Sequence, residues 1–300
     1  MKPSGAATGD GILDLGRVAG GIFCFGGPYS NVQATRAALA EAERLGFPPE
    51  RVVCTGDVVA YCADPAATVA LVRAAGIRVV MGNCEESLAF DGEDCGCGFA
   101  DDSQCAAWSR AWFAFAQAAL DADAKAWMAG LPRQIRLGLG GRRLAVIHGG
   151  DQNISEYVFQ STPAAAKAEC FERLAALDPI DGVIGGHAGL PFTQIVGGRL
   201  WHNPGVVGMP ANDGTPNVWF SILTAGADGI SVALNPLTYD HAAAARALRA
   251  VSPNLPYALT LENGLWPNMD VLPAAERARV GRPLQAETVV WPARAPVAAE

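Results

Sequence analysis

Apolar runs that end in polar residues recur along the first two-thirds of the chain. In four of them the polar end holds a carboxylate, an amide or a histidine directly after the run or after a glycine: residues 51–57, 79–85, 144–148 and 182–187. Each run is typical of a buried β-strand that opens into a loop. Because sites in open α/β sheets are built where strands end, we expect these four ends to form one site.

Segments with helical periodicity lie between the first predicted strands of the chain. Short apolar runs predict strands over 20–25, 51–55 and 77–81. Apolar residues at helical spacing predict helices over 32–45 and 65–75, the first capped by Ser30 or Asn31 and the second by Asp64. This order of strands and helices predicts parallel strands joined by right-handed crossovers.

The later part of the chain has a different pattern. Alternating residues around glycine turns predict hairpins over 133–147, 193–201 and 218–234. Helices are expected over 162–177 and 239–250. We expect residues 1–15 to form a flexible lead-in and residues 281–300 to form an extended tail.

Residues 86–130 interrupt the alternation of strands and helices. An acidic, glycine-rich loop over 90–103 contains Cys95-Gly96-Cys97, and two helices rich in Ala and Trp are predicted after it. Trp108 and Trp112 lie at helical spacing and are expected to pack within this cover. We therefore predict an α/β protein with one domain over residues 1–270, a helical insertion at about 86–130, and a C-terminal extension over 271–300.

Composition and charge narrow the class of protein. The chain has 300 residues, of which 50% are hydrophobic and 17% are charged, so it can bury a large core. A net charge of -8 argues against a nucleic-acid backbone as the main partner. With no long apolar stretch and no signal pattern at the start, we expect no membrane partner and a cytoplasmic location. The 8 cysteines are then expected to be reduced thiols, metal ligands or core residues rather than disulfides.

The polar strand ends offer oxygen and nitrogen ligands for a metal. Asp57, Asn83, His148 and His187 together form a set suited to Zn, Fe or Mn. Each has an ordinary structural alternative: a loop aspartate, a turn asparagine or a histidine satisfied within the core. However, both histidines follow apolar strands and are flanked by glycine, which leaves room for a ligand to approach.

The order of these residues resembles the calcineurin-like metallophosphoesterases, and it is most similar to their small bacterial phosphodiesterase branch. The resemblance covers roughly residues 19–235. It implies a four-layer α/β/β/α sandwich with two metal ions that activate water and stabilise phosphoryl oxygens. By position, Asp57 would bridge the two ions, and Asn83, His148 and His187 would complete one site. The motifs are Gly56-Asp57, Gly82-Asn83-Cys84-Glu85, His148-Gly149, Gly186-His187-Ala188-Gly189 and Asn203-Pro204-Gly205.

Three ligand positions of the family are changed in this chain. Gly27 and Tyr29 stand where the family's first motif has an aspartate and a histidine, and Gly189 stands where its last motif has a second histidine. These three changes remove ligands of one ion and leave the protein ligands of the other. We therefore predict one bound transition-metal ion, either Mn, Fe or Zn, rather than two.

The resemblance also proposes residues around the metal. Cys84 replaces a histidine that assists the leaving group or contacts phosphate, Glu85 replaces its orienting acid, and Tyr29 has a phenol that could reach metal or phosphate, so these three are the predicted catalytic residues. A tyrosine packed in its loop would give the same pattern at Tyr29. The predicted substrate contacts, in a loop that could equally be solvated, are Asp151, Asn153 and Tyr157.

Three functions remain open from the sequence. The first is hydrolysis of a phosphate mono- or diester of a small molecule or nucleotide through the single metal. The second is a catalytically inactive ligand-binding or scaffold protein on the same fold. The third is non-phosphate chemistry at a metal site assisted by the Cys84 thiol. Cys95, Cys97 and Cys105 fit either a second metal or a redox-sensitive pair.

Overall fold

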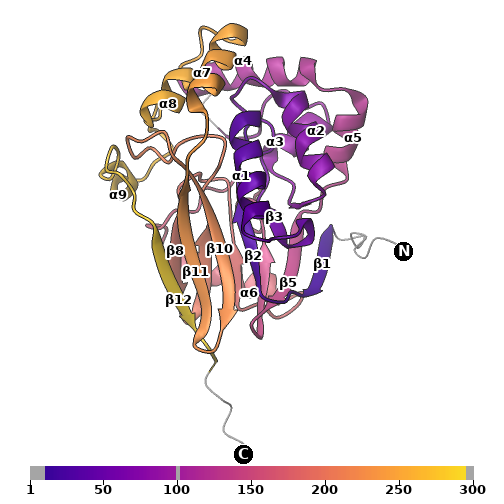
Figure 1. Cartoon of the computed structure of the whole chain (residues 1–300), viewed down its shortest axis with the longest axis vertical. Coiled ribbons are helices and arrows are strands. Elements are labelled where there is room, and N and C mark those ends of the chain that lie inside the picture. Colours follow the sequence, from indigo (N-terminus) through magenta and orange to yellow (C-terminus); the bar gives the residue numbers. More distant parts are fainter. Residues whose placement is uncertain (1–10, 99–101, 295–300) are drawn as a thin grey trace, which may run out of the picture.

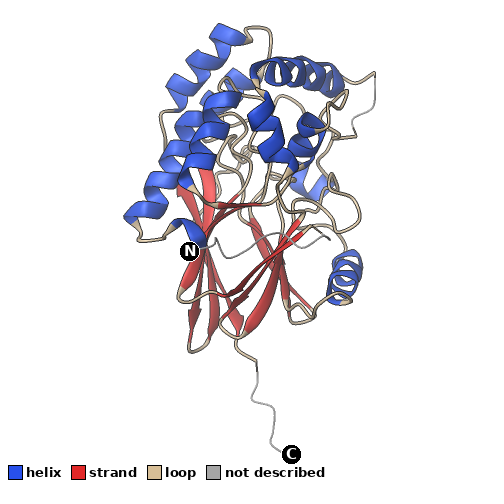
Figure 2. Cartoon of the chain, turned by 90° about the vertical axis from the view of Figure 1, so that its right-hand side faces the viewer, coloured by secondary structure: helices blue, strands red, loops and turns tan. Residues whose placement is uncertain are grey.

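Two stacked β-sheets with helices on both outer faces make up the protein (Figures 1 and 2). The computed structural model describes residues 11–98 and 102–294. From one face to the other the layers are helices, sheet, sheet and helix, as the α/β/β/α resemblance predicts.

The first sheet contains the parallel strands that the early part of the sequence predicts. Its strand order is β12-β11-β10-β2-β3-β4, with β2, β3 and β4 parallel and the remaining neighbours antiparallel. The crossovers are α1 (Val32–Arg44) and α2 (Pro65–Ala75). The strands are β2 (Gly21–Phe25), β3 (Val52–Cys54), β4 (Arg78–Val79), β10 (Val218–Gly226), β11 (Gly229–Leu237) and β12 (Glu287–Pro292).

The second sheet has the strand order β1-β5-β6-β7-β9-β8. Two of the predicted hairpins lie in it, β5 with β6 and β8 with β9, and the third is β10 with β11 in the first sheet. Helix α6 (Ala164–Ala175) covers its outer face. The strands are β1 (Ile12–Arg17), β5 (Gln134–Leu139), β6 (Arg142–Val146), β7 (Gly182–Ile184), β8 (Phe192–Val196) and β9 (Arg199–Asn203).

The two faces of β2 belong to different parts of the hydrophobic core. Ile22 and Cys24 are fully buried between the two sheets, whereas Phe23 and Phe25 are buried under the helices. Successive side chains of a strand point to opposite faces, so a strand buried on both sides is apolar throughout. Phe23 stacks on Phe220 of β10 with ring centroids 4.6 Å apart, which ties the helix-side core to the sheet.

Helices gather at the end of the sheets where the polar strand ends lie (Figure 1). In the predicted cover, Trp112 and Met128 are buried in the helix-side core, and Cys95 forms a disulfide with Cys97. No helix among the described residues is long and apolar enough to cross a membrane. The helices are α3 (Asn83–Ala89), α4 (Gln104–Ala119), α5 (Ala122–Ala129), α7 (His241–Val251), α8 (Tyr257–Asn263) and α9 (Ala274–Arg277), with a 3-10 turn at Pro49–Arg51.

Two expectations at the ends of the chain were wrong. Part of the predicted lead-in forms β1, which pairs in parallel with β5. Part of the predicted tail forms β12, which pairs with β11 and buries Trp291 between the sheets. Both strands lie at the edge of a sheet and contain exposed polar residues. Neither therefore shows the continuous apolar run that is typical of a central strand. The expectation of reduced thiols was also wrong for Cys95 and Cys97, while six other cysteines are free.

Candidate metal centre

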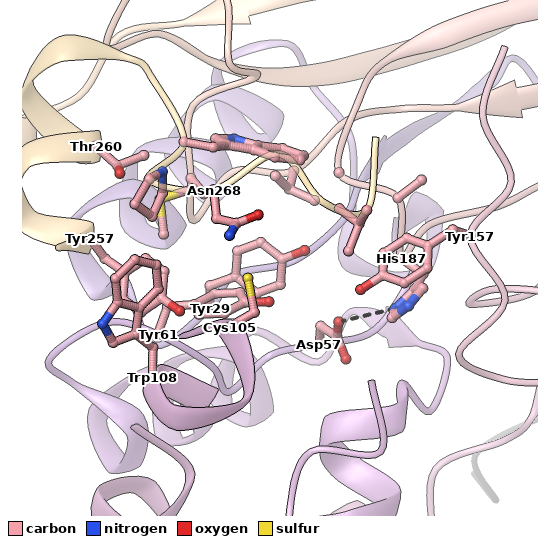
Figure 3. A pocket seen from close by; sticks show the side chains of 17 residues that line it. Tyr29, Asp57, Tyr61, Cys105, Trp108, Tyr157, His187, Tyr257, Thr260 and Asn268 are labelled. Carbon is pink, nitrogen blue, oxygen red and sulfur yellow. Dashed lines mark ion pairs between the residues drawn. The ribbon is translucent and has the colours of Figure 1, made fainter. Parts of the chain in front are cut away.

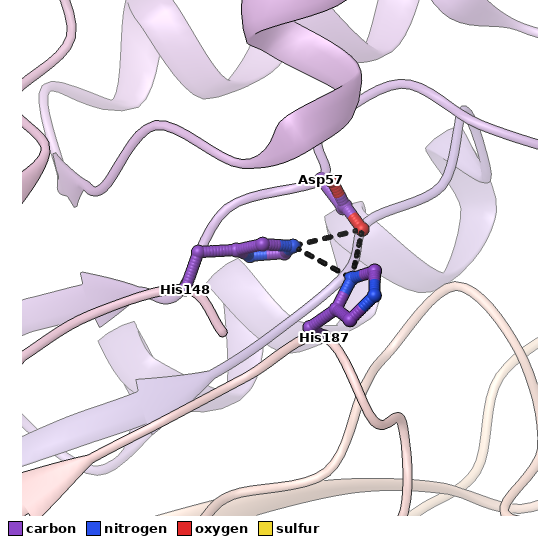
Figure 4. A group of neighbouring side chains, drawn as sticks. All are labelled: Asp57, His148 and His187. Atoms are coloured by element: carbon purple, nitrogen blue, oxygen red, sulfur yellow. Dashed lines mark hydrogen bonds and ion pairs between the residues drawn. The ribbon is translucent and has the colours of Figure 1, made fainter. Parts of the chain in front are cut away.

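The four predicted ligands come together at the carboxyl ends of four strands. Asp57 follows β3, Asn83 follows β4 and begins α3, His148 follows β6, and His187 follows β7. All four side chains are buried. The site therefore lies where the two stacked sheets present their strand ends to the same space, and Figure 4 shows both imidazoles directed at the Asp57 carboxylate.

The ligand atoms are close enough to share one ion. His148 Nε2 lies 2.9 Å from Asn83 Oδ1, 3.1 Å from His187 Nδ1 and 3.2 Å from Asp57 Oδ2. His187 Nδ1 lies 3.9 Å from Asp57 Oδ2. One ligand atom from each of Asp57, His148 and His187 lies within 4.8 Å of the other two.

The hydrogen bonds behind these atoms direct lone pairs toward the common point. His148 Nδ1 lies 2.6 Å from the Thr55 carbonyl oxygen, which can only accept, so Nδ1 donates and Nε2 keeps its lone pair. Asn83 Nδ2 donates to the Cys95 carbonyl oxygen at 2.6 Å, which leaves Asn83 Oδ1 facing His148. Acceptors that face one another in a buried site repel unless a cation lies between them, so the donor set fits a metal ion.

Without a metal ion, positive charge on the histidines takes the place of a cation beside Asp57. Burial alone would raise the pKa of Asp57, but the charge of His148 and hydrogen bonds to both histidines outweigh it and lower the pKa. Burial would lower the pKa of His148, yet the Asp57 carboxylate raises it overall. For His187, burial together with the neighbouring His148 lowers the pKa despite Asp57. The aspartate is thus held ionised between two imidazoles.

The backbone at the site is held in an uncommon conformation. Asp57 has φ 56°, His187 has φ 55° and Tyr29 has φ 50°, all in the left-handed region that non-glycine residues rarely adopt. Such residues concentrate at functional sites, where the surrounding structure fixes them.

Glu85 fixes the Asp57 loop. Its buried carboxylate accepts hydrogen bonds from the backbone N–H groups of Asp57 at 2.7 Å, Gly82 at 2.9 Å and Val59 at 3.3 Å. Burial and the nearby Asp57 charge raise the pKa of Glu85 to about 7. Both carboxylate oxygens of Glu85 accept backbone hydrogen bonds, and through them Glu85 fixes the position of Asp57.

Cys84 lies beside the predicted metal ligands. It is not among the described residues that line the cavity next to Asp57. Its backbone N–H donates to Asp57 Oδ1 at 3.3 Å, and its side chain is buried in the helix-side core. Burial and the charges of Asp57 and Glu85 raise the pKa of Cys84 well above that of an ordinary thiol. This shift favours the neutral thiol, and the predicted catalytic role of Cys84 stays a prediction.

Aromatic rings occupy the other side of Asp57. A Cβ added to Gly27 would lie 2.5 Å from the Tyr29 ring, and one added to Gly189 would lie 3.4 Å from the Trp266 ring. Gly27 and Gly189 also have positive φ, at 39° and 70°. A side chain at Gly27 would overlap the Tyr29 ring, whereas a Cβ at Gly189 would make ordinary contact with Trp266.

Next to Asp57 and His187 lies a cavity of about 100 Å³ (Figure 3). Of the predicted substrate contacts, Tyr157 lines it and packs against His187 with ring centroids 4.3 Å apart. Asp151 instead pairs with Arg173 at 2.7 Å, and Asn153 accepts from the Ser155 backbone at 2.9 Å. Neither Asp151 nor Asn153 lines this cavity, and their predicted role remains untested.

Several residues of the site carry no signal in the sequence. The Thr55 and Cys95 carbonyl groups orient two ligands, but any residue type could supply a carbonyl. Tyr61, Tyr257 and Trp266 line the cavity from segments far apart in the chain. Trp108 packs against the helix-side core, as expected, and also lines the cavity, while Trp112 is buried in that core. The only sequence feature that indicates a function for these segments is the length of the loops around them.

The fold and the ligand set define a metallophosphoesterase-type protein. Residues 30–226 match the sequence model described as the calcineurin-like phosphoesterase superfamily domain, and the chain belongs to that superfamily. A comparison with curated proteins finds no match.

Two solved structures show the same fold. A hypothetical protein from Pyrococcus horikoshii OT3 is 15% identical with a TM-score of 0.67, and the alignment covers 81% of this chain and 98% of that one. A metallophosphoesterase from Sphaerobacter thermophilus is 22% identical with a TM-score of 0.62, over 83% of this chain and 100% of that one.

Proposed function

We propose that the protein is a metal-dependent phosphoesterase that works with a single transition-metal ion, either Mn, Fe or Zn. The ion would be held by Asp57, Asn83, His148 and His187. The observation that carries the proposal is the convergence of four buried acceptor atoms, with His148 Nε2 within 3.2 Å of the other three. A bound ion of this kind polarises a phosphoryl oxygen and lowers the pKa of water.

The residues of the chain would do the remaining work. Asp57 supplies the only carboxylate among the four ligands, and Glu85 holds its loop through three backbone N–H groups. The cavity beside Asp57 would hold the organic part of a phosphate mono- or diester of a small molecule or nucleotide and exclude water from it.

Metal analysis and a pair of chromogenic esters test this proposal. The purified chain is loaded with Mn, Fe or Zn, and its metal content is measured by mass spectrometry. We expect one ion per chain and metal-dependent cleavage of bis-p-nitrophenyl phosphate or p-nitrophenyl phosphate. No bound metal, together with unchanged behaviour of Asp57→Asn and His187→Ala, would refute the proposal.

A second candidate is a ligand-binding protein without catalysis. The packing of Tyr29 against Gly27 favours it, because a ring fills the space beside Gly27, where the resemblance implies a metal-binding aspartate. It predicts that both esters stay intact with every metal while a ligand raises the melting temperature. The third function that the sequence leaves open, thiol-assisted chemistry, would need Cys84 as a thiolate, and the raised pKa of this thiol disfavours that state.

A further inference from the structure

Six aromatic side chains lie among the 17 residues that line the cavity beside the candidate metal centre. Tyr61, Trp108 and Tyr257 lie on one side of it, and Tyr157 lies on the other beside His187 (Figure 3). The metal ligands Asp57 and His187 form part of the same wall. The six aromatic residues are Tyr29, Tyr61, Trp108, Tyr157, Tyr257 and Trp266.

The rings cross one another rather than lying parallel. Tyr29 and Tyr61 have centroids 5.0 Å apart at 83°, Tyr61 and Tyr257 are 4.9 Å apart at 54°, and Trp108 and Tyr257 are 6.3 Å apart at 72°. Nucleobases bind by stacking their flat faces on a ring. Crossed rings instead present faces and edges around a compact group, which is the arrangement of cages that bind quaternary ammonium ions.

The charges around the cavity favour a cation. Neither Lys nor Arg occurs among the described residues that line it, and the charged side chain in the wall is the Asp57 carboxylate. A second carboxylate contacts a lining residue: Asp270 accepts a hydrogen bond from Asn268 at 2.9 Å. Besides burial, its charge raises the pKa of the lining thiol Cys105. An anionic group in the cavity would therefore find no lysine or arginine side chain in the described wall.

The walls are neutral and held in place. Burial raises the pKa of Tyr61 and Tyr257 well above the ordinary tyrosine value, so both phenols stay uncharged and keep their rings available. The indole N–H of Trp266 donates to the Pro210 carbonyl oxygen at 2.7 Å, and its backbone N–H donates to Asn212 Oδ1 at 2.8 Å. A wall fixed before binding loses little entropy when a ligand enters.

We propose that this cavity binds the quaternary ammonium group of a zwitterionic phosphoester, with the phosphate at the neighbouring metal centre. The phosphate part rests on the proposed function, because it needs the ion at Asp57. The ammonium part depends on the aromatic wall alone. The substrate class is thus a choline-type phosphate mono- or diester.

Isothermal titration calorimetry of the full chain separates the two parts. The first probe is choline, and the second is 3,3-dimethylbutan-1-ol, which has the same shape without the charge. We expect choline to bind about tenfold more tightly than the neutral alcohol, with or without a chelator in the buffer, because the rings attract the cation. Adenosine serves as a third probe for stacking. Equal or tighter binding of the alcohol or of adenosine would overturn the proposal.

Variants locate the binding in the cavity. Trp108→Leu and Tyr257→Leu are expected to weaken choline binding by about tenfold, whereas Tyr257→Phe keeps the ring and should retain it. Trp127→Leu is the matched control, since Trp127 does not line the cavity. Thermal unfolding of each variant checks that it folds. If Tyr257→Phe loses choline binding like Tyr257→Leu, the ring is not the binding element and the proposal fails.

The same samples distinguish failure of the inference from failure of the proposed function. Choline binding without cleavage of any ester by the metal-loaded chain would leave the aromatic cage in place and refute the phosphoesterase. Metal-dependent cleavage of bis-p-nitrophenyl phosphate without choline binding would do the opposite.

Discussion

The two sides of Asp57 have opposite characters. On one side, Asn83, His148 and His187 bring three further ligand atoms to the carboxylate. On the other side, two glycines are packed against the rings of Tyr29 and Trp266. The polar side presents ligand atoms for a metal ion, whereas the other side presents aromatic rings in place of carboxylate or imidazole groups. The difference shows that ligand atoms gather on one side of Asp57 and aromatic packing on the other.

The two sides of Asp57 also differ in the groups that hold their side chains in place. Three of the four predicted ligands have a partner that orients them: the Thr55 carbonyl for His148, the Cys95 carbonyl for Asn83, and the Glu85 carboxylate for the Asp57 loop. Partners behind metal ligands fix their orientation and basicity. The aromatic side depends instead on close packing, which tolerates no added atom at Gly27. Changes on the two sides should therefore have different consequences.

The largest effect is expected from the residue that both sides share. Asp57→Asn removes the only charged ligand and should lower metal affinity by more than about a hundredfold, since changes behind ligands already cost ~10–100-fold. Metal content after gel filtration measures this. Asp228→Asn, at an exposed turn between β10 and β11, is the matched control and should bind metal normally. A chelator should also lower the melting temperature of the wild type and leave that of Asp57→Asn unchanged.

Glu85 tests the support behind the polar side. Glu85→Ala leaves the backbone N–H groups of Asp57, Gly82 and Val59 without their acceptor, and should destabilise the protein by about 3 kcal/mol or more. Urea unfolding of the metal-free chain measures the loss. Glu85→Gln keeps one acceptor oxygen and should lose about half as much. Equal losses for the two variants would show that the loop does not depend on these hydrogen bonds.

The aromatic side can be tested by adding one carbon. Gly27→Ala places a Cβ 2.5 Å from the Tyr29 ring at a residue with φ 39°, and should cost about 2–3 kcal/mol of stability. In a Tyr29→Ala background the overlap is gone, so the same change should cost only its backbone strain, about 1 kcal/mol. Additive losses in this double-mutant cycle would mean that the ring does not fill the space beside Gly27.

The two sides were not equally predictable from the sequence. Asp57, Asn83, His148 and His187 could be predicted because each closes a strand, and strand ends meet by topology alone. The aromatic wall could not, because Trp108 and Trp266 come from segments that meet only through tertiary packing. The edge strands β1 and β12 were missed for a similar reason: pairing with a neighbour, rather than a local pattern, makes them strands.

A smaller effect is expected from the disulfide next to the polar side. Asn83 Nδ2 donates to the Cys95 carbonyl oxygen, and it lies 3.3 Å from Cys97 Sγ. Reduction with dithiothreitol should release this loop and lower metal affinity by about tenfold through misorientation of Asn83. A double variant, Cys95→Ser with Cys97→Ser, should start at the lower affinity and not respond to the reductant. A reductant response in the double variant would assign the effect to another thiol.

The smallest effect on the metal is expected from the phenol of Tyr29. Tyr29→Phe keeps the ring that fills the space beside Gly27, so metal content should stay at one ion per chain and stability should change by less than about 0.5 kcal/mol. Because the phenol is removed without the ring, any fall in kcat at constant metal content would belong to the hydroxyl and support its predicted catalytic role. Unchanged kcat would leave Tyr29 as packing alone. Tyr157→Phe, on the opposite wall beside His187, is the matched control for loss of a cavity hydroxyl.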